Sequence, residues 1–142
     1  RDETGLHEDD GIEILFDPNL DKSNTWQKDD IAYHVNAINV ILDDRGINSK
    51  GEFDNTWNGQ AKTSVKINGT LNNTNDEDSG YQVEFAITWK ELGLVPKAGL
   101  SLGINLAVND RDDIHLHYRY FDYMGLTVFH NPSGFTELTL IE

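Results

Sequence analysis

The 142-residue sequence contains no cysteine, and this absence excludes disulfides, iron–sulfur clusters and thiolate zinc sites. It also lacks any apolar run approaching the ~20 residues that a membrane-spanning helix needs. Basic residues are scarce, with 11 lysines and arginines against 25 acidic residues and a net charge of -14. Nucleic acids and anionic membranes bind basic surfaces, so this charge argues against both as partners. The length fits a single domain over residues 1–142.

Apolar and polar residues alternate in short runs between turn signals, a pattern typical of strands with one face in a core. The clearest run lies within residues 80–94, and its inward positions are Tyr81, Val83, Phe85, Ile87 and Trp89. We expect this run to be the centre of the fold and Thr88 to begin one helical turn at its end. About eight strands, one short helical turn and no long helix predict an all-β fold, an antiparallel β-sandwich of the jelly-roll or immunoglobulin-like kind.

Carboxylates and amides gather in the loops that flank three expected strands. Oxygen ligands of this kind suit calcium, and clustered carboxylates repel one another unless a cation neutralises them. The loop after residue 17 has an Asp-x-Asn-x-Asp spacing, without the glycine and late glutamate of an EF-hand loop. The sequence therefore predicts structural calcium, and an acidic surface that only aids solubility is the alternative. The candidate ligands are Asp17, Asn19, Asp21, Asp29, Asp30, Asp110 and Asp112.

Aromatic side chains in polar loops are candidates for stacking on sugar rings. Trp26 lies in such a loop without apolar neighbours in sequence, while Tyr120 and Phe129 belong to a dense aromatic group near the C-terminus. We expect Trp57, in a second polar loop, to close the end of the sandwich instead. No nucleophile elbow, phosphate loop or histidine–carboxylate motif is present, so we expect no independent catalysis.

Three stretches, in this order, resemble the family 9 carbohydrate-binding modules. They are DDGIEILFDPNLDK, then GYQVEFAITWKELGL followed by KAGLSLGINLAVND, and NPSGFTELTLIE. The stretch WNGQAKTSVKINGTLN is similar to a segment of the wider relatives. The resemblance implies a β-sandwich on secreted polysaccharide-degrading or surface proteins, with structural calcium and no catalysis of its own. The partners that it implies are a polysaccharide or oligosaccharide and a covalently linked hydrolase or lyase domain.

The resemblance also implies strands ahead of the DDGIEI segment that have no counterpart here. The chain is similar to the C-terminal part of such a module, and a missing N-terminal segment would supply the neighbouring strands. We therefore expect the strand at residues 11–17 to lie at a sheet edge, or to pair with a segment outside residues 1–142.

In the family, a glucose unit lies between two tryptophans, and the matching positions here are His7 and Phe129. Polar partners of the sugar match Glu13 on the first strand and His34 on the next strand, where the family has an arginine. The resemblance thus implies a sugar site with His7 and Phe129 as walls and with Glu13 and His34 as hydroxyl partners. Trp26 and Tyr120 are the further candidates.

Two other function classes stay open at this stage. The absence of both sandwiching tryptophans favours a structural or adhesion domain that has kept the fold and lost the sugar site. Related sandwiches also include redox domains that bind haem b through histidine and methionine. Met124, the only methionine, and one of five histidines would be the ligands here, and a Soret band in the purified protein would decide this.

Overall fold

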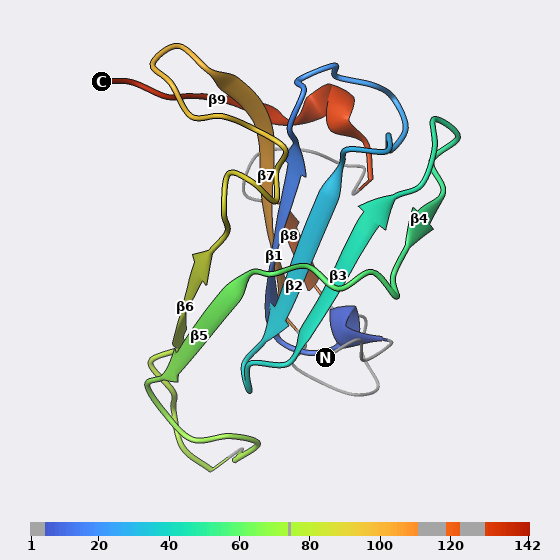
Figure 1. The fold of residues 1–142 in the computed structure, drawn as a ribbon. Helices are drawn as coiled ribbons and strands as arrows, with labels where there is room; N and C mark the ends of the chain where they lie inside the picture. Colours follow the sequence, from blue (N-terminus) through green and yellow to red (C-terminus); the bar gives the residue numbers. More distant parts are fainter. Residues whose placement is uncertain (1–4, 74, 111–118, 123–129) are drawn as a thin grey trace.

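A computed structural model describes residues 5–73, 75–110 and 130–142, and the backbone alone of residues 119–122. Its strands form two antiparallel sheets that pack as a sandwich (Figure 1). The larger sheet has seven strands in the order β4-β3-β2-β1-β7-β8, with β9 also paired to β7, and the smaller sheet is β5-β6. The strands are β1 (Gly11–Asp17), β2 (Ile31–Asn36), β3 (Ile41–Gly46), β4 (Phe53–Asp54), β5 (Lys62–Ile67), β6 (Tyr81–Ala86), β7 (Ser101–Asp110), β8 (Arg119–Asp122) and β9 (Thr136–Thr139). The predicted all-β sandwich is confirmed.

Helical structure is short wherever the structure describes the chain. Two 3-10 turns are present, η1 (Leu6–Glu8) and η2 (Pro132–Gly134). The predicted helical turn after β6 also forms: the Thr88 hydroxyl accepts from the backbone N–H of Glu91 at 3.2 Å, and the turn closes at Gly93 with φ of 68°. Within the described residues, no helix is both long and apolar enough to span a bilayer.

The first strand lies inside the larger sheet, so its predicted position at an edge is wrong. β1 pairs with β2 from Gly11↔Asn36 to Phe16↔Ile31. On its other side it pairs with β7 along its whole length. The prediction failed because the second neighbour of β1 comes from about ninety residues along the chain, and no local pattern reports such a pairing.

One core cluster lies between the two sheets. Phe16, Tyr33 and Leu102 are buried in it, and Phe85 and Trp89 pack against it from the side of the smaller sheet. The expected parity of β6 is correct: the residues predicted to face inward are partly buried, and those between them are exposed. Its expected role as the centre of the fold is wrong. β6 has only β5 as a partner, so its inward side chains are only partly buried.

A second core cluster lies on the opposite face of the larger sheet. Its buried members are Leu15, Trp26, Ala32 and Phe135. The larger sheet therefore buries side chains on both faces, and for this reason β2 is buried at every position.

Strand β3 continues to its last residue, Gly46, without a break. Gly46, at the end of β3, donates its backbone N–H to the carbonyl of Asp30 at 2.9 Å. A Cβ added at Gly46 would lie 1.7 Å from the carbonyl oxygen of Gln27, so only glycine fits this approach of two backbones.

Replacement of Gly46 by alanine is expected to destabilise the fold, because the rigid backbone of Gln27 must move. We expect a loss of roughly 3 kcal/mol in the free energy of unfolding, measured by urea denaturation. Ser64→Ala on the exposed face of β5 is the control and should change stability by less than about 0.5 kcal/mol. Equal stability of the two variants would contradict the close approach.

Candidate functional site

Polar side chains from four strands meet on the face of the larger sheet that points away from β5-β6. Glu13 of β1 is directly opposite His34 of β2, so the two side chains leave the sheet on the same side. Asp44 of β3 is opposite Ala32, two residues from His34, and therefore joins them. Asn109 of β7 reaches the same face because it is opposite Gly11, two residues from Glu13.

These four side chains, which we call the polar cluster, contact one another through ion pairs and hydrogen bonds. The His34 Nδ1 atom lies 2.9 Å from Glu13 Oε1, and its Nε2 atom lies 3.1 Å from Asp44 Oδ2. The Asn109 amide donates to Glu13 Oε1 at 2.6 Å. All four residues are buried, with exposed fractions between 1 % for Glu13 and 5 % for His34. The polar cluster is thus a network of charged and amide groups inside the protein.

The surroundings of His34 shift its titration. Burial alone would lower the pKa of His34, but the hydrogen bonds and negative charges of Asp44 and Glu13 outweigh burial and raise the pKa to about 9. His130, which precedes η2, behaves in the opposite way. Burial lowers the pKa of His130 to about 4, so this second imidazole is neutral at pH 7.

Among the residues that the structure describes, the buried side-chain atoms without a hydrogen-bond partner on this face include two carboxylate oxygens and one amide nitrogen. They are Glu13 Oε2, Asp44 Oδ1 and the side-chain nitrogen of Asn105, which lies opposite Leu15 on β7. A buried polar group without a partner costs about 1–3 kcal/mol, more when it is charged. Two carboxylate acceptors and one amide donor are therefore suited to hydroxyl groups, which both donate and accept.

The predicted sugar residues have different outcomes. The structure brings Glu13 and His34 together on adjacent strands. His7 lies exposed in η1, and Tyr120 is placed only by its backbone, opposite Asn109. Phe129 lies outside the described residues.

The prediction that Trp26 stacks on a sugar is wrong. Its ring is fully buried, and it packs edge-on against His130 with ring centroids 4.6 Å apart and against Phe53 at 6.1 Å. A ring without exposed surface cannot stack on a sugar, so Trp26 is a core residue of the second cluster. Polar neighbours in sequence gave the false signal, because the partners of Trp26 come from distant segments.

Sequence reasoning missed Asp44 and Asn109. The strand β3 extends through Asp44, and following its parity across the neighbouring strand would have placed Asp44 beside His34. Asn109 has the same parity as Asn105 and Ala107, the buried side of β7. The other parity of β7 carries apolar residues such as Ile104, so polarity alone gives no sign that Asn109 lies on a buried face.

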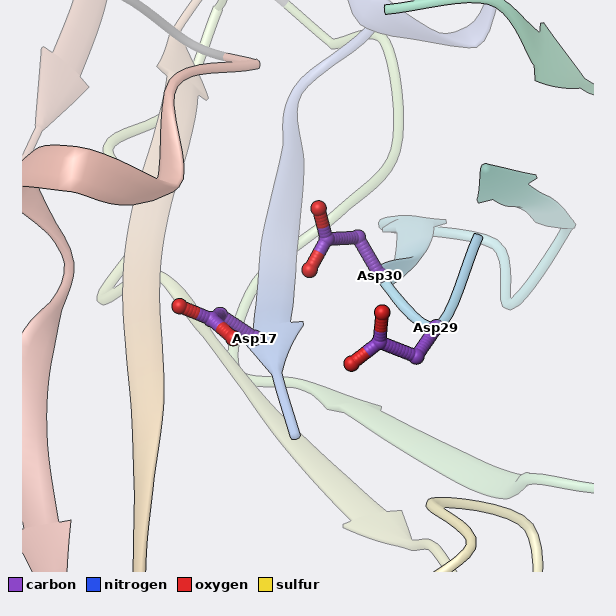
Figure 2. Close-up of side chains that lie close together, drawn as sticks. All are labelled: Asp17, Asp29 and Asp30. Carbon is purple, nitrogen blue, oxygen red and sulfur yellow. The ribbon is translucent and has the colours of Figure 1, made fainter. Parts of the chain in front are cut away.

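A second group of carboxylates lies at the other end of β1. Asp17 ends β1, while Asp29 and Asp30 precede β2, and Figure 2 shows the three side chains turned toward one another. Each offers an oxygen, and these oxygens lie within 4.8 Å of one another. Asp17 and Asp30 are fully buried, and we call these three residues the acidic cluster. Three predicted metal ligands are thus brought together.

The acidic cluster is electrostatically strained. Burial raises the pKa of Asp30 to about 8 against the hydrogen bond from the Gln27 backbone, and the charges of Asp17 and Asp29 add to the rise. Burial likewise raises the pKa of Asp17. Asp30 Oδ1 and Asp29 Oδ2 are buried without a hydrogen-bond partner. A divalent cation would relieve both the repulsion and the unpaired oxygens.

The other predicted metal ligands that the structure describes are not part of the acidic cluster, whose oxygens lie within 4.8 Å of one another. Asn19 and Asp21 are exposed, and their side chains accept the backbone N–H groups of Asp21 and Ser23 at 2.8 and 2.9 Å. These bonds shape the loop. Asp110 lies at the opposite end of β7 from Gly103, the partner of Asp17. Asp112 lies outside the described residues.

The pKa of Asp30 predicts how stability depends on pH when divalent cations are absent. The folded carboxyl keeps its proton up to pH about 8, whereas the unfolded one loses it near 3.8, so stability falls as pH rises between these values. Asp30→Asn has a neutral side chain of equal size. In EDTA its melting temperature should exceed that of the wild type by roughly 5 °C or more above pH 8, and the difference should shrink steadily as pH falls and vanish only near pH 3.8. Glu137→Gln, exposed on β9, is the control, and a difference independent of pH would contradict the shift.

Comparisons with known proteins agree with this architecture. The chain is 32 % identical over 128 residues to "Exoglucanase XynX" of Acetivibrio thermocellus, covering 90 % of this chain and 9 % of that protein. It is 28 % identical over 144 residues to "Endo-1,4-beta-xylanase A" of Thermotoga maritima, covering 100 % of this chain and 12 % of that protein. The chain thus spans a small part of the curated relatives that it matches.

Solved structures extend the comparison. A family 9 carbohydrate-binding module from Caldicellulosiruptor kristjanssonii in complex with glucose has a TM-score of 0.70 and 26 % identity, covering 96 % of this chain and 61 % of that chain. The module from the same organism in complex with cellotriose has the same TM-score and covers 98 % of this chain. The family model described as "Carbohydrate family 9 binding domain-like" matches residues 1–142. The chain therefore belongs to family 9 of the carbohydrate-binding modules, a family of binding domains and not of enzymes.

Proposed function

We propose that this chain binds a neutral sugar or the end of a polysaccharide through its polar cluster. The observation that carries the proposal is the pair of buried, unpartnered carboxylate oxygens of Glu13 and Asp44, held on strands β1 and β3 at either side of β2. Sugar hydroxyls donate to carboxylates through charge-assisted hydrogen bonds, which are stronger than neutral ones. The relatives in complex with glucose and cellotriose support the same ligand class.

The proposed sugar contacts extend beyond the two carboxylates. The Asn105 amide, also unpartnered, is placed to donate to a hydroxyl or ring oxygen. His7, Tyr120 and Phe129 are the proposed walls that stack on the sugar faces. Histidine and phenylalanine offer less stacking area than two tryptophans, so we expect affinities weaker than those of relatives with tryptophan walls. Because the polar cluster is closed to solvent, binding requires this face to open.

Glu13→Gln tests the sugar site. The substitution keeps the shape of the side chain and removes the charge that strengthens its hydrogen bonds. We expect affinity for glucose and cellotriose, measured by calorimetry, to fall by roughly 10- to 100-fold, because a charge-assisted bond contributes about 1.5–3 kcal/mol. Glu84→Gln, exposed on β6, should bind like the wild type. Unchanged affinity in a folded Glu13→Gln, or no sugar binding by the wild type, would contradict the proposal.

We propose in addition that the acidic cluster binds a structural calcium ion. The donor set supports this, because hard carboxylate oxygens are the ligands that calcium prefers. The buried and unpaired oxygens of Asp29 and Asp30 also support it, since each lacks the partner that burial calls for. The proposed ion would join the loop of Asp17 to the entry of β2. Asn19, Asp21, Asp110 and Asp112 remain proposed ligands of this or another ion.

Removal of calcium should lower stability. A ligand that binds only the folded state adds about 2.7 kcal/mol at a hundredfold excess over its Kd. We expect the wild type to melt several degrees higher in calcium than in EDTA at pH 8, as followed by circular dichroism. Asp29→Asn should melt at the same temperature in both buffers, whereas Glu137→Gln on β9 should keep the difference. Identical wild-type melting curves in calcium and in EDTA would contradict the calcium proposal.

The relatives also support a proposal about the setting of the chain. Two of them are named as an exoglucanase and an endo-xylanase, and the chain matches only 9 % and 12 % of their lengths. We propose that this chain likewise acts as a module of a secreted or cell-surface polysaccharide-degrading protein. Its role there is to hold a linked catalytic domain near its substrate.

A further inference from the structure

We propose that His34 is a permanent cation of the folded protein and that it positions Glu13 and Asp44 to receive the sugar. His34 is a positioning residue in this scheme, because its ring nitrogens contact one oxygen of each carboxylate and leave the second oxygen of each for the ligand. The inference deepens the proposed function and rests on it for its consequence in sugar binding. The charge state of His34 can be tested without any sugar.

The geometry of the ring supports the cation. Both nitrogens of His34 face carboxylate oxygens, at 2.9 Å to Glu13 and 3.1 Å to Asp44. An ionised carboxylate only accepts hydrogen bonds, and a neutral imidazole has only one N–H. One of the two contacts would then set a nitrogen lone pair against an anion. Both contacts are favourable together when both nitrogens carry hydrogens, that is, when the ring is an imidazolium.

The surroundings of the ring add to this argument. The charged and titratable groups that face His34 are Glu13 from β1, Asp44 from β3 and His130 from the segment before η2, among the side chains that the structure describes. Asn109 of β7 is neutral and bonds to Glu13. Without a cation, two buried carboxylates would lie on either side of a neutral ring, each without compensation.

The cation also fixes where the carboxylates point. Glu13 Oε1 is held by His34 and by the Asn109 amide, so Oε2 has one defined direction. Asp44 Oδ2 is held by the other ring nitrogen, and this leaves Oδ1 without a partner. A preorganised pair of acceptors binds hydroxyls without losing side-chain entropy at the moment of binding.

The charge balance of this group limits the ligand. Two carboxylates and one imidazolium leave one excess negative charge, and His130 is neutral near pH 7. A sugar with its own carboxylate would meet like charge at the site, so neutral sugars are selected over uronic acids.

The pH dependence follows from the sign of the shift. The pKa of His34 is raised in the folded state to about 9, so the cation is present below this pH and is lost as pH rises through it. Sugar affinity should therefore be constant from pH 6 to 8 and fall above about 9.

The first test measures the charge of His34 directly, by NMR of the 15N-labelled chain, with His34→Gln to assign its signals. We expect both ring nitrogens to carry hydrogens at pH 7 and to titrate near pH 9. A neutral ring at pH 7, with the proton on a carboxyl instead, would overturn the inference whatever the result with sugar. If His34→Gln does not fold, selective labelling of histidine with assignment through Val35 replaces it.

The second test measures affinity for glucose, glucuronate and cellotriose between pH 6 and 10 in constant calcium. The wild type should lose at least tenfold in cellotriose affinity between pH 8 and 10, and glucuronate should bind at least tenfold more weakly than glucose. His34→Arg keeps its charge throughout and should show no such loss, whereas His34→Gln should bind weakly at every pH. Wild-type affinity that stays flat to pH 10, or equal binding of glucuronate, would overturn the inference. No wild-type binding at pH 7 would instead overturn the proposed sugar site, while the NMR result still decides the charge.

Discussion

The pairing of β1 on both sides is the constraint on which the rest of the structure depends. Because side chains alternate along a strand, one hydrogen-bond register sends Ile14 and Phe16 into the core between the sheets and Glu13 and Asp17 to the other face. A slip of one residue would exchange these faces, placing carboxylates in the apolar core. The same register therefore secures the core, the polar cluster and the acidic cluster.

The two groups of buried carboxylates differ in what compensates them. In the polar cluster, His34 lies between Glu13 and Asp44, so the chain supplies its own counter-charge. In the acidic cluster, backbone N–H groups reach Asp17 and Asp30, but no cationic side chain is bonded to the group among the described residues. Hydrogen bonds lower the cost of burial without removing the repulsion between like charges. The acidic cluster is thus suited to an external cation, whereas the polar cluster is suited to a neutral ligand.

The sequence predicted what depends on local alternation and missed what depends on distant pairing. The alternation of β6 was predicted correctly, because a period of two is a local property. The placement of Glu13 and His34 on successive strands came from the family resemblance, and the structure brings them side by side. The neighbour of β1 could not be predicted, since β7 is joined to it only by folding. Trp26 was misplaced for the same reason: its contacts with Phe53 and His130 come from segments far along the chain. The family resemblance added the role of Glu13, which alternation alone does not give.

The division of the site between strands and loops explains how its selectivity and its affinity can vary separately. Glu13 and Asn109 belong to central strands that other strands hold on both sides, so their positions are fixed to within the tolerance of the sheet. His7, by contrast, lies exposed in the short turn η1. In the proposed sugar site, carboxylates on strands would select the hydroxyls, while the proposed stacking walls would contribute apolar contact that tolerates different rings. Replacement of a wall residue during evolution can therefore weaken binding and leave the recognised sugar unchanged.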